Sequence, residues 1–201
     1  MKKVAIIGAG PSGMLAGIKI KESLGDKVNV VIYEKKDRVG KKILASGNGR
    51  CNLSNTDLDM SYYNNAFVNN IIKEINSTSL RCYFQELGLI TMPDSSGRIY
   101  PITDMASTVL DILLRKISEL QIEVKTNTLV TNINKENDKY ILTTNNELHP
   151  FDIVILATGG KSSSYLGSNG EGYALAKELG AKITPLKPGL VGLKTTKDSI
   201  K

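Results

Sequence analysis

The sequence of 201 residues contains little of what several protein classes require. Its two cysteines, Cys51 and Cys82, have neither the spacing of a redox pair nor the company of zinc ligands, so we predict reduced thiols and no metal site. The longest apolar run, from Ile153 to Ala157, is far shorter than the roughly 20 residues that a membrane span needs. We therefore predict no membrane contact.

Aromatic residues and histidine are also scarce. There is no tryptophan, and 18 glycines stand against six prolines, which favours an α/β fold with tight turns over an aromatic-rich sandwich. The only histidine, His149, precedes Pro150, and we interpret it as a solvated loop residue. The net charge is +6, yet the basic residues are spread along the chain, which argues against nucleic acid as a partner. Gly8 ends the first apolar run too early for a signal peptide, so a cytoplasmic location is expected.

The first 34 residues predict a βαβ unit. Val4–Ile7 and Val28–Tyr33 are apolar strands of the kind buried in parallel sheets, and an amphipathic helix lies between them. Three short polar-apolar strands between 129 and 151 predict an antiparallel meander, and the strand 153–157 returns to the parallel sheet. The fold class is therefore a doubly wound α/β fold, a Rossmann-type domain with a β-meander.

A G-x-G-x-x-G motif fills the turn between the first strand and its helix. Gly8 permits the tight turn, Gly10 lets the backbone approach a pyrophosphate, and Gly13 allows close packing of helix on strand. With Pro11 and Ser12 at the helix start, unpaired N–H groups and the helix dipole would meet the phosphate charge. The context of the motif therefore predicts a dinucleotide-binding site.

Glu34 ends the second strand, where an acid accepts hydrogen bonds from ribose hydroxyls. Its charge disfavours a 2′-phosphate, which argues against NADP and for NAD or FAD. Lys35 and Gly40 follow in a pattern that resembles FAD-binding flavoproteins, so FAD is the predicted cofactor. Ala157-Thr158-Gly159 resembles the second glycine turn of that superfamily, and the resemblance implies that the backbone of Val130 contacts the adenine.

The segment 35–55 lacks a regular period and is too long for a simple connection, so we predict that it binds the ligand. Its small residues, amides, thiol and guanidinium suit hydrogen bonds to flavin heteroatoms, with Arg50 close to the ring. A purely structural Ω-loop is the alternative. We interpret Cys51 as a packed or cofactor-adjacent thiol, and Lys42 as the lysine best placed for a phosphate. The predicted cofactor residues of this segment are Lys41, Lys42, Ser46, Gly47, Asn48, Gly49, Arg50, Cys51 and Asn52.

The stretch Gly40-Lys41-Lys42-Ile43-Leu44-Ala45-Ser46-Gly47-Asn48-Gly49-Arg50-Cys51-Asn52-Leu53-Ser54-Asn55 resembles the G-x-K-x-x-x-S-G-x-G-R-C-N-x-T-N signature of the BaiN-like or YhiN-like bacterial flavoproteins, also called the aminoacetone oxidase family. Residues 97–101 and 167–173 resemble two further motifs of that family. Ala181 stands where the family commonly has histidine, and Gly189 and Gly192 interrupt its P-A-L-V-P-L. These differences bear on what the resemblance implies for the substrate, not on what it implies for the flavin.

The resemblance implies an FAD-binding domain over residues 1–190 and, at 191–201, the start of a second domain missing from this chain, because family members are about twice as long. A naturally short relative is the alternative. The implied function is a flavin-dependent oxidoreductase that transfers hydride through the isoalloxazine, with NAD(P)H as the expected donor and a small-molecule substrate. No catalytic acid or base and no oligomeric state is predicted. A flavin-dependent tRNA-modifying enzyme and a non-catalytic dinucleotide-binding module remain as other functions.

Overall fold

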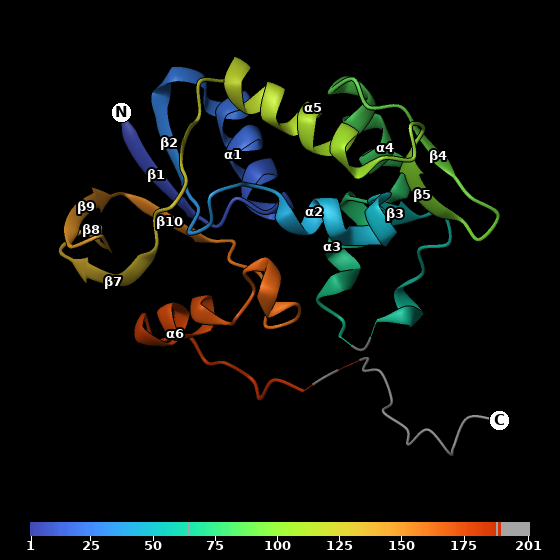
Figure 1. The fold of residues 1–201 in the computed structure, drawn as a ribbon. Coiled ribbons are helices and arrows are strands. Elements are labelled where there is room, and N and C mark those ends of the chain that lie inside the picture. Colours follow the sequence, from blue (N-terminus) through green and yellow to red (C-terminus); the bar gives the residue numbers. More distant parts are fainter. Residues whose placement is uncertain (64, 188, 190–201) are drawn as a thin grey trace.

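The computed structural model describes residues 1–63, 65–187 and 189, and the predicted start of a second domain at 191–201 lies outside them. Figure 1 shows the chain as one α/β body with a separate small β-meander at one side. The helices are α1 (Pro11–Leu24), α2 (Lys41–Ala45), α3 (Val68–Glu74), α4 (Ser77–Glu86), α5 (Ala106–Glu119) and α6 (Glu171–Glu178). The strands are β1 (Lys2–Ile7), β2 (Val28–Tyr33), β3 (Ser54–Asn55), β4 (Thr91–Pro93), β5 (Arg98–Pro101), β6 (Glu123–Lys125), β7 (Val130–Glu136), β8 (Lys139–Thr144), β9 (Glu147–Phe151) and β10 (Ile153–Leu156).

A parallel sheet in the order β10-β1-β2-β6 forms the centre of the fold. β1 pairs with β2 from Lys2 opposite Val28 to Ile7 opposite Tyr33, and with β10 from Val4 opposite Ile153. All three pairings in this sheet are parallel, so the carboxyl ends of β1, β2 and β10 meet at one edge. This is the edge at which open α/β sheets bind ligands.

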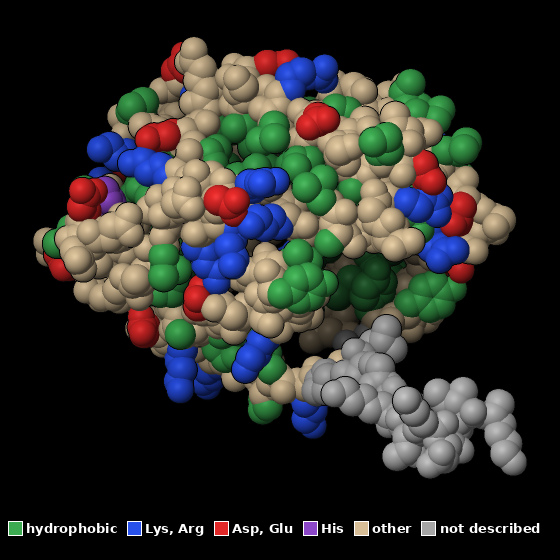
Figure 2. All heavy atoms as spheres, viewed as in Figure 1, with side chains coloured by type: hydrophobic (Ala, Val, Ile, Leu, Met, Phe, Trp, Pro, Cys, Tyr) green, Lys and Arg blue, Asp and Glu red, His purple; other side chains and the backbone are tan. Residues whose placement is uncertain are grey.

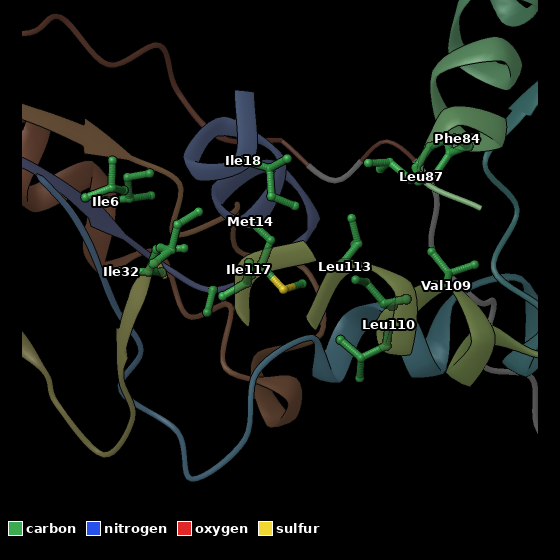
Figure 3. Packing of buried hydrophobic residues seen from close by; sticks show 14 of the residues in the cluster. Ile6, Met14, Ile18, Ile32, Phe84, Leu87, Val109, Leu110, Leu113 and Ile117 are labelled. Carbon is green, nitrogen blue, oxygen red and sulfur yellow. The ribbon is translucent and has the colours of Figure 1, made fainter. Parts of the chain in front are cut away.

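Both faces of the sheet are covered, as the apolar strands predict. Alternate side chains of β1 point to opposite faces, so Ile6 packs in the cluster under α1 and α5 while Ile7 packs against the meander and α6. Figure 3 shows Met14 and Ile18 of α1 close to Ile6 and Ile32. These side chains are fully buried, and such burial stabilises each by about 1.5 to 3 kcal/mol.

The meander is confirmed as the antiparallel sheet β7-β8-β9. Leu142 at its centre is fully buried, and Phe151 packs edge-on against Tyr33 of the parallel sheet at a ring-centroid distance of 6.0 Å. β10 then returns beside β1, but as an edge strand, so Ile153 is 44% exposed instead of buried.

The segment 35–55 is more regular than its sequence predicts. It contains the short helix α2, a 3₁₀ turn over Ser46–Gly49 and the strand β3, which pairs antiparallel with β5. β4 and β5 form a hairpin around the turn at 94–97. Within the described residues, no helix combines the length and the apolar character needed to cross a membrane.

Candidate functional site

A cavity of about 500 Å³ opens at the carboxyl edge of the parallel sheet. Its walls come from the glycine turn after β1, the end of β2, helix α2, the loop after α2, and the turns that follow β10. The predicted cofactor residues that line it are Gly8, Gly10, Pro11, Ser12, Glu34, Lys35, Gly40, Lys41, Lys42, Ser46, Cys51, Asn52, Val130, Ala157, Thr158 and Gly159. Gly13, Gly47, Asn48, Gly49 and Arg50 are not on its wall in the described part of the chain.

The three glycines of the turn after β1 differ in what a side chain at each position would meet. Gly8 has φ of +109°, and a Cβ there would lie 2.4 Å from the carbonyl oxygen of Ala157. A Cβ on Gly13 would lie 1.9 Å from the carbonyl oxygen of Gly8. A Cβ on Gly10 would meet no atom within 4 Å, and Gly10 lines the cavity. Gly8 and Gly13 therefore serve the packing of the turn, whereas the bare backbone of Gly10 leaves room for a ligand.

The start of α1 faces this space with free polar groups. Gly10 is the N-cap residue, Pro11 is in the first turn, and no side chain caps the helix. The first N–H groups of a helix lack partners inside it and carry the positive end of its dipole. The end of α1 is therefore suited to an anionic group such as a pyrophosphate.

Glu34 ties the end of β2 to the glycine turn. Its Oε2 accepts a hydrogen bond from the N–H of Ala9 at 3.0 Å, and its Oε1 accepts one from the N–H of Lys36 at 2.9 Å. Each carboxylate oxygen has a further lone pair, so the group can still accept hydrogen bonds from a ribose in the cavity. The position predicted for the ribose acceptor is thus fixed by two backbone contacts.

Lysines surround the same part of the cavity, and Figure 2 shows Lys and Arg side chains gathered near the middle of this face. Lys35 donates to Glu171 and to Asn169, and Lys41 pairs with Asp37. Burial works to raise the pKa of Glu171, but the hydrogen bonds from Lys35 and Asn169 lower that pKa overall.

Lys42 differs from its neighbours. It forms no ion pair among the described residues, and its Nζ would lie 2.7 Å from a Cβ built on Gly159. The buried Ser168 lies on the same side, with its Oγ 3.1 Å from that position. Lys42 therefore places an uncompensated positive charge at the second glycine turn.

Only some residues of the loop after α2 line the cavity among the described residues. Ser46, Cys51 and Asn52 line the wall, and Cys51 is 6% exposed. Burial raises the pKa of the Cys51 thiol, which keeps it protonated at neutral pH. The Arg50 guanidinium instead pairs with Asp104 and stacks on Tyr100.

Val130, Leu129 and Tyr33 give one part of the cavity wall an apolar surface that suits a planar base. Val130 is buried there beside Leu129 and Tyr33. Burial raises the pKa of Tyr33 to about 12, so the ring stays neutral. The sequence predicts that the backbone of Val130 contacts the adenine of the cofactor, and Val130 lines this part of the wall.

Several wall residues were not predicted from the sequence. Residues 167–169 and Glu171 lie in the motif Gly167-Ser168-Asn169-Gly170-Glu171-Gly172-Tyr173, so its glycines and polar residues were the available signal, and Leu166 directly precedes it. Leu80, Phe84, Val109 and Leu113, from α4 and α5, have only the helical period of core residues, which does not distinguish a cavity wall from a core.

Comparisons with known proteins place the chain in a family. Over residues 2–200 the chain matches the family described as HI0933-like protein Rossmann domain. It is 40% identical to a 3-dehydro-bile acid delta(4,6)-reductase of Clostridium scindens over 98% of this chain and 48% of that protein. It is 26% identical to a ribosomal RNA dihydrouridine synthase of Escherichia coli over 92% of this chain and 46% of that protein. The chain thus spans about half the length of the curated relatives it matches.

Solved structures confirm the fold. Thermovibrio ammonificans THI4 superimposes with a TM-score of 0.56 at 16% identity, over 90% of this chain and 64% of that one. CtdE, whose structure contains FAD and a substrate, superimposes with a TM-score of 0.50 at 16% identity, over 82% of this chain and 39% of that one. The family expected from the motif at 40–55 and the Rossmann-type fold are both confirmed, and the chain belongs to the HI0933-like Rossmann domain family.

Proposed function

We propose that this chain is the FAD-binding part of a flavin-dependent reductase. The observation that carries the proposal is the juxtaposition, in one cavity, of open space at Gly10, the uncapped start of α1, and Glu34 at the end of β2. Together they offer a bare backbone and unpaired N–H groups for a pyrophosphate and an anionic acceptor for ribose hydroxyls.

The chemistry of the cavity fits FAD along its whole length. Val130 and Tyr33 supply an apolar end for the adenine, and Lys42 a positive charge near the second glycine turn. Ser46, Cys51 and Asn52 supply small polar groups on the wall where the isoalloxazine would lie. The flavin, when bound, supplies the hydride chemistry, and the residues of this chain bind it and hold it in place.

The relatives narrow the reaction class. The relative at 40% identity is named a reductase of 3-dehydro-bile acids, which favours a small organic molecule as the substrate of the whole protein. NADH or NADPH is the proposed hydride donor. Because FAD is proposed to occupy the site beside Glu34, either donor would have to bind elsewhere on the protein.

A second candidate substrate is RNA. The relatives at 26% and 25% identity are named ribosomal RNA dihydrouridine synthases, and this chain carries a net charge of +6. An RNA substrate requires basic residues on one continuous surface, because phosphate contacts dominate affinity and depend strongly on salt. Binding of a ribosomal RNA fragment measured at two salt concentrations separates this candidate from a small-molecule reductase.

The proposal is tested by titrating the purified chain with FAD and following the quenching of flavin fluorescence. We expect saturable binding near one FAD per chain, together with the visible absorbance of bound oxidised flavin. FMN lacks the adenosine half and is the matched control ligand, and it should bind more weakly because it leaves Glu34 and Val130 without a partner. Absence of saturable FAD binding by a folded chain contradicts the proposal.

A further inference from the structure

The loop from Ser46 to Asn52 has an unusual backbone. Gly47, Asn48, Gly49 and Cys51 have φ values of 55°, 57°, 84° and 61°, all in the left-handed region. Cys51 carries a Cβ, so this conformation is unfavourable for it, and less so for Asn48, because asparagine adopts it more readily. Such a loop keeps one shape only where surrounding contacts determine it.

Cys51 of this loop packs in the main hydrophobic core, and Arg50 adds two contacts on the outer side. Its Nε lies 2.5 Å from Oδ1 of Asp104, and its Cζ lies 3.8 Å from the ring centroid of Tyr100. Tyr100 is buried, and a Cβ on Gly47 would lie 3.3 Å from its ring. The Tyr100 ring thus contacts the loop at Arg50 and approaches it at Gly47.

The backbone of Asp104 is held in a tight turn, and its side chain is 55% exposed. Its φ is 56°, and its N–H donates a hydrogen bond to the carbonyl oxygen of Pro101 at 2.8 Å. This turn follows β5, which pairs with β3 just beyond the loop. The Asp104 carboxylate therefore faces Arg50 from a fixed part of the fold, outside the cavity wall of the described residues.

The other side of the same loop forms the cavity wall. The N–H of Cys51 donates to the carbonyl oxygen of Ser46 at 3.0 Å, which closes the loop. Both of these residues line the cavity, and so does Asn52. A movement of Arg50 would therefore displace the adjacent Cys51 and Asn52.

We propose that Asp104 is a positioning residue of the cofactor site, which acts by holding Arg50 against Tyr100 so that Ser46, Cys51 and Asn52 keep their places on the cavity wall. Arg50 then serves as the anchor of the loop instead of a direct flavin ligand. The inference rests on the proposed function for the identity of the ligand, but the anchor itself can be tested without flavin.

The Cys51 thiol reports on the loop. In a Cys82→Ser chain, Cys51 is the only thiol, and its reaction with a disulfide reagent such as DTNB is slow while it is buried with a raised pKa. We expect Arg50→Ala, which removes an ion pair and a cation–π contact, to speed this reaction about five- to tenfold. Asp104→Asn removes the exposed ion pair alone and should speed it about two- to fivefold. Arg50→Lys should fall between the parent chain and Arg50→Ala, because it keeps the charge and loses the planar stack.

The control is Lys139→Ala, which removes a partly exposed ion pair with Asp152 in the β-meander, away from the loop. It should leave the Cys51 rate unchanged. Because Asp104 acts through Arg50, the double variant should react no faster than Arg50→Ala alone. Urea unfolding of each variant shows whether a rate change exceeds the change in global stability.

FAD titration of the same variants completes the test. We expect Asp104→Asn to weaken FAD binding about two- to fivefold in parallel with the thiol rate. An unchanged Cys51 rate, additive effects in the double variant, or faster thiol reaction with unchanged FAD affinity overturns the positioning role. If the parent chain binds no FAD, the proposed function fails, while the thiol rates still decide whether Asp104 anchors the loop.

Discussion

Glu34 and Ala9 join two elements that are distant in the sequence, because Oε2 of Glu34 accepts the N–H of Ala9 at 3.0 Å. The carboxylate that is predicted to bind the ribose thus also fixes the backbone of the glycine turn. A change at position 34 is therefore expected to act on the ribose and on the phosphate part of the site together.

Glu34→Ala should weaken FAD binding by about 1 to 3 kcal/mol, because charge-assisted hydrogen bonds are lost. Glu34→Gln should lie between, since the amide keeps one acceptor oxygen for the two N–H groups that the carboxylate now binds. Fluorescence titration with FAD, and competition with ADP, which carries the same ribose, measure the effect. Equal affinity in folded Glu34→Ala and parent chains would disprove the assignment.

Gly10 and Gly13 should respond in opposite ways to a side chain. Gly10→Val places its side chain in the open cavity, so the chain should fold with unchanged circular dichroism and lose FAD binding. Gly13→Ala brings a Cβ to 1.9 Å from the Gly8 carbonyl oxygen, so it should destabilise the fold itself. Tight FAD binding by Gly10→Val, or a fully stable Gly13→Ala, contradicts these roles.

The sequence predicted the parts of the fold that depend on local pattern. β1, the glycine turn, α1 and β2 follow one another within 33 residues, so apolar period and glycine spacing were sufficient. The β4–β5 hairpin was missed because its strands are only three and four residues long and read as a turn. The exposure of Ile153 was missed because an edge strand has the same apolar letters as a central one.

The sequence likewise predicted the part of the candidate site that a local motif determines, but not the part that depends on tertiary contacts. Glu34 and Gly10 take part in a motif with fixed spacing, so their placement followed from the sequence. The placement of Arg50 did not, because it depends on Asp104 and Tyr100, which only the tertiary fold brings near. Sequence composition indicated a guanidinium in the loop but not the direction in which it points.

The ion pair between Lys35 and Glu171 makes a pH-dependent contribution to the free energy of unfolding. The folded pKa of Glu171 lies below its ordinary value of 4.5, so the stability it contributes is present above that value and is lost as the pH falls through the folded pKa. Both side chains are partly exposed, so Glu171→Gln should reduce the free energy of unfolding by less than about 1 kcal/mol at neutral pH.

Urea unfolding at a series of pH values from neutral downward checks this difference, which should shrink as the pH falls below 4.5, because the carboxylate is protonated first in the unfolded chain and then in the folded one. Glu136→Gln is the control, since this exposed carboxylate forms no ion pair in the described part of the chain. A loss of stability in Glu171→Gln that stays constant down to about pH 3 contradicts the role of the ion pair.

Lys42 and Lys41 are adjacent in the sequence but have different surroundings. Comparing their alanine variants therefore tests whether a lysine charge binds the cofactor phosphates. Lys41 already pairs with Asp37 at 2.6 Å, whereas Lys42 lines the cavity beside Gly159 without an ion pair among the described residues. A free ammonium in a partly enclosed site gains most from a phosphate, so Lys42→Ala should weaken FAD binding by about 1.5 to 3 kcal/mol. Lys41→Ala should change the affinity for FAD by less than about 0.5 kcal/mol, because the Lys41 charge is already neutralised.

Titrations at low and high salt separate the effect of charge from that of packing, since salt screening should reduce the difference in FAD affinity between the parent chain and Lys42→Ala. Equal losses in the two variants, or a gap that salt leaves unchanged, would show that the Lys42 charge does not act on the cofactor.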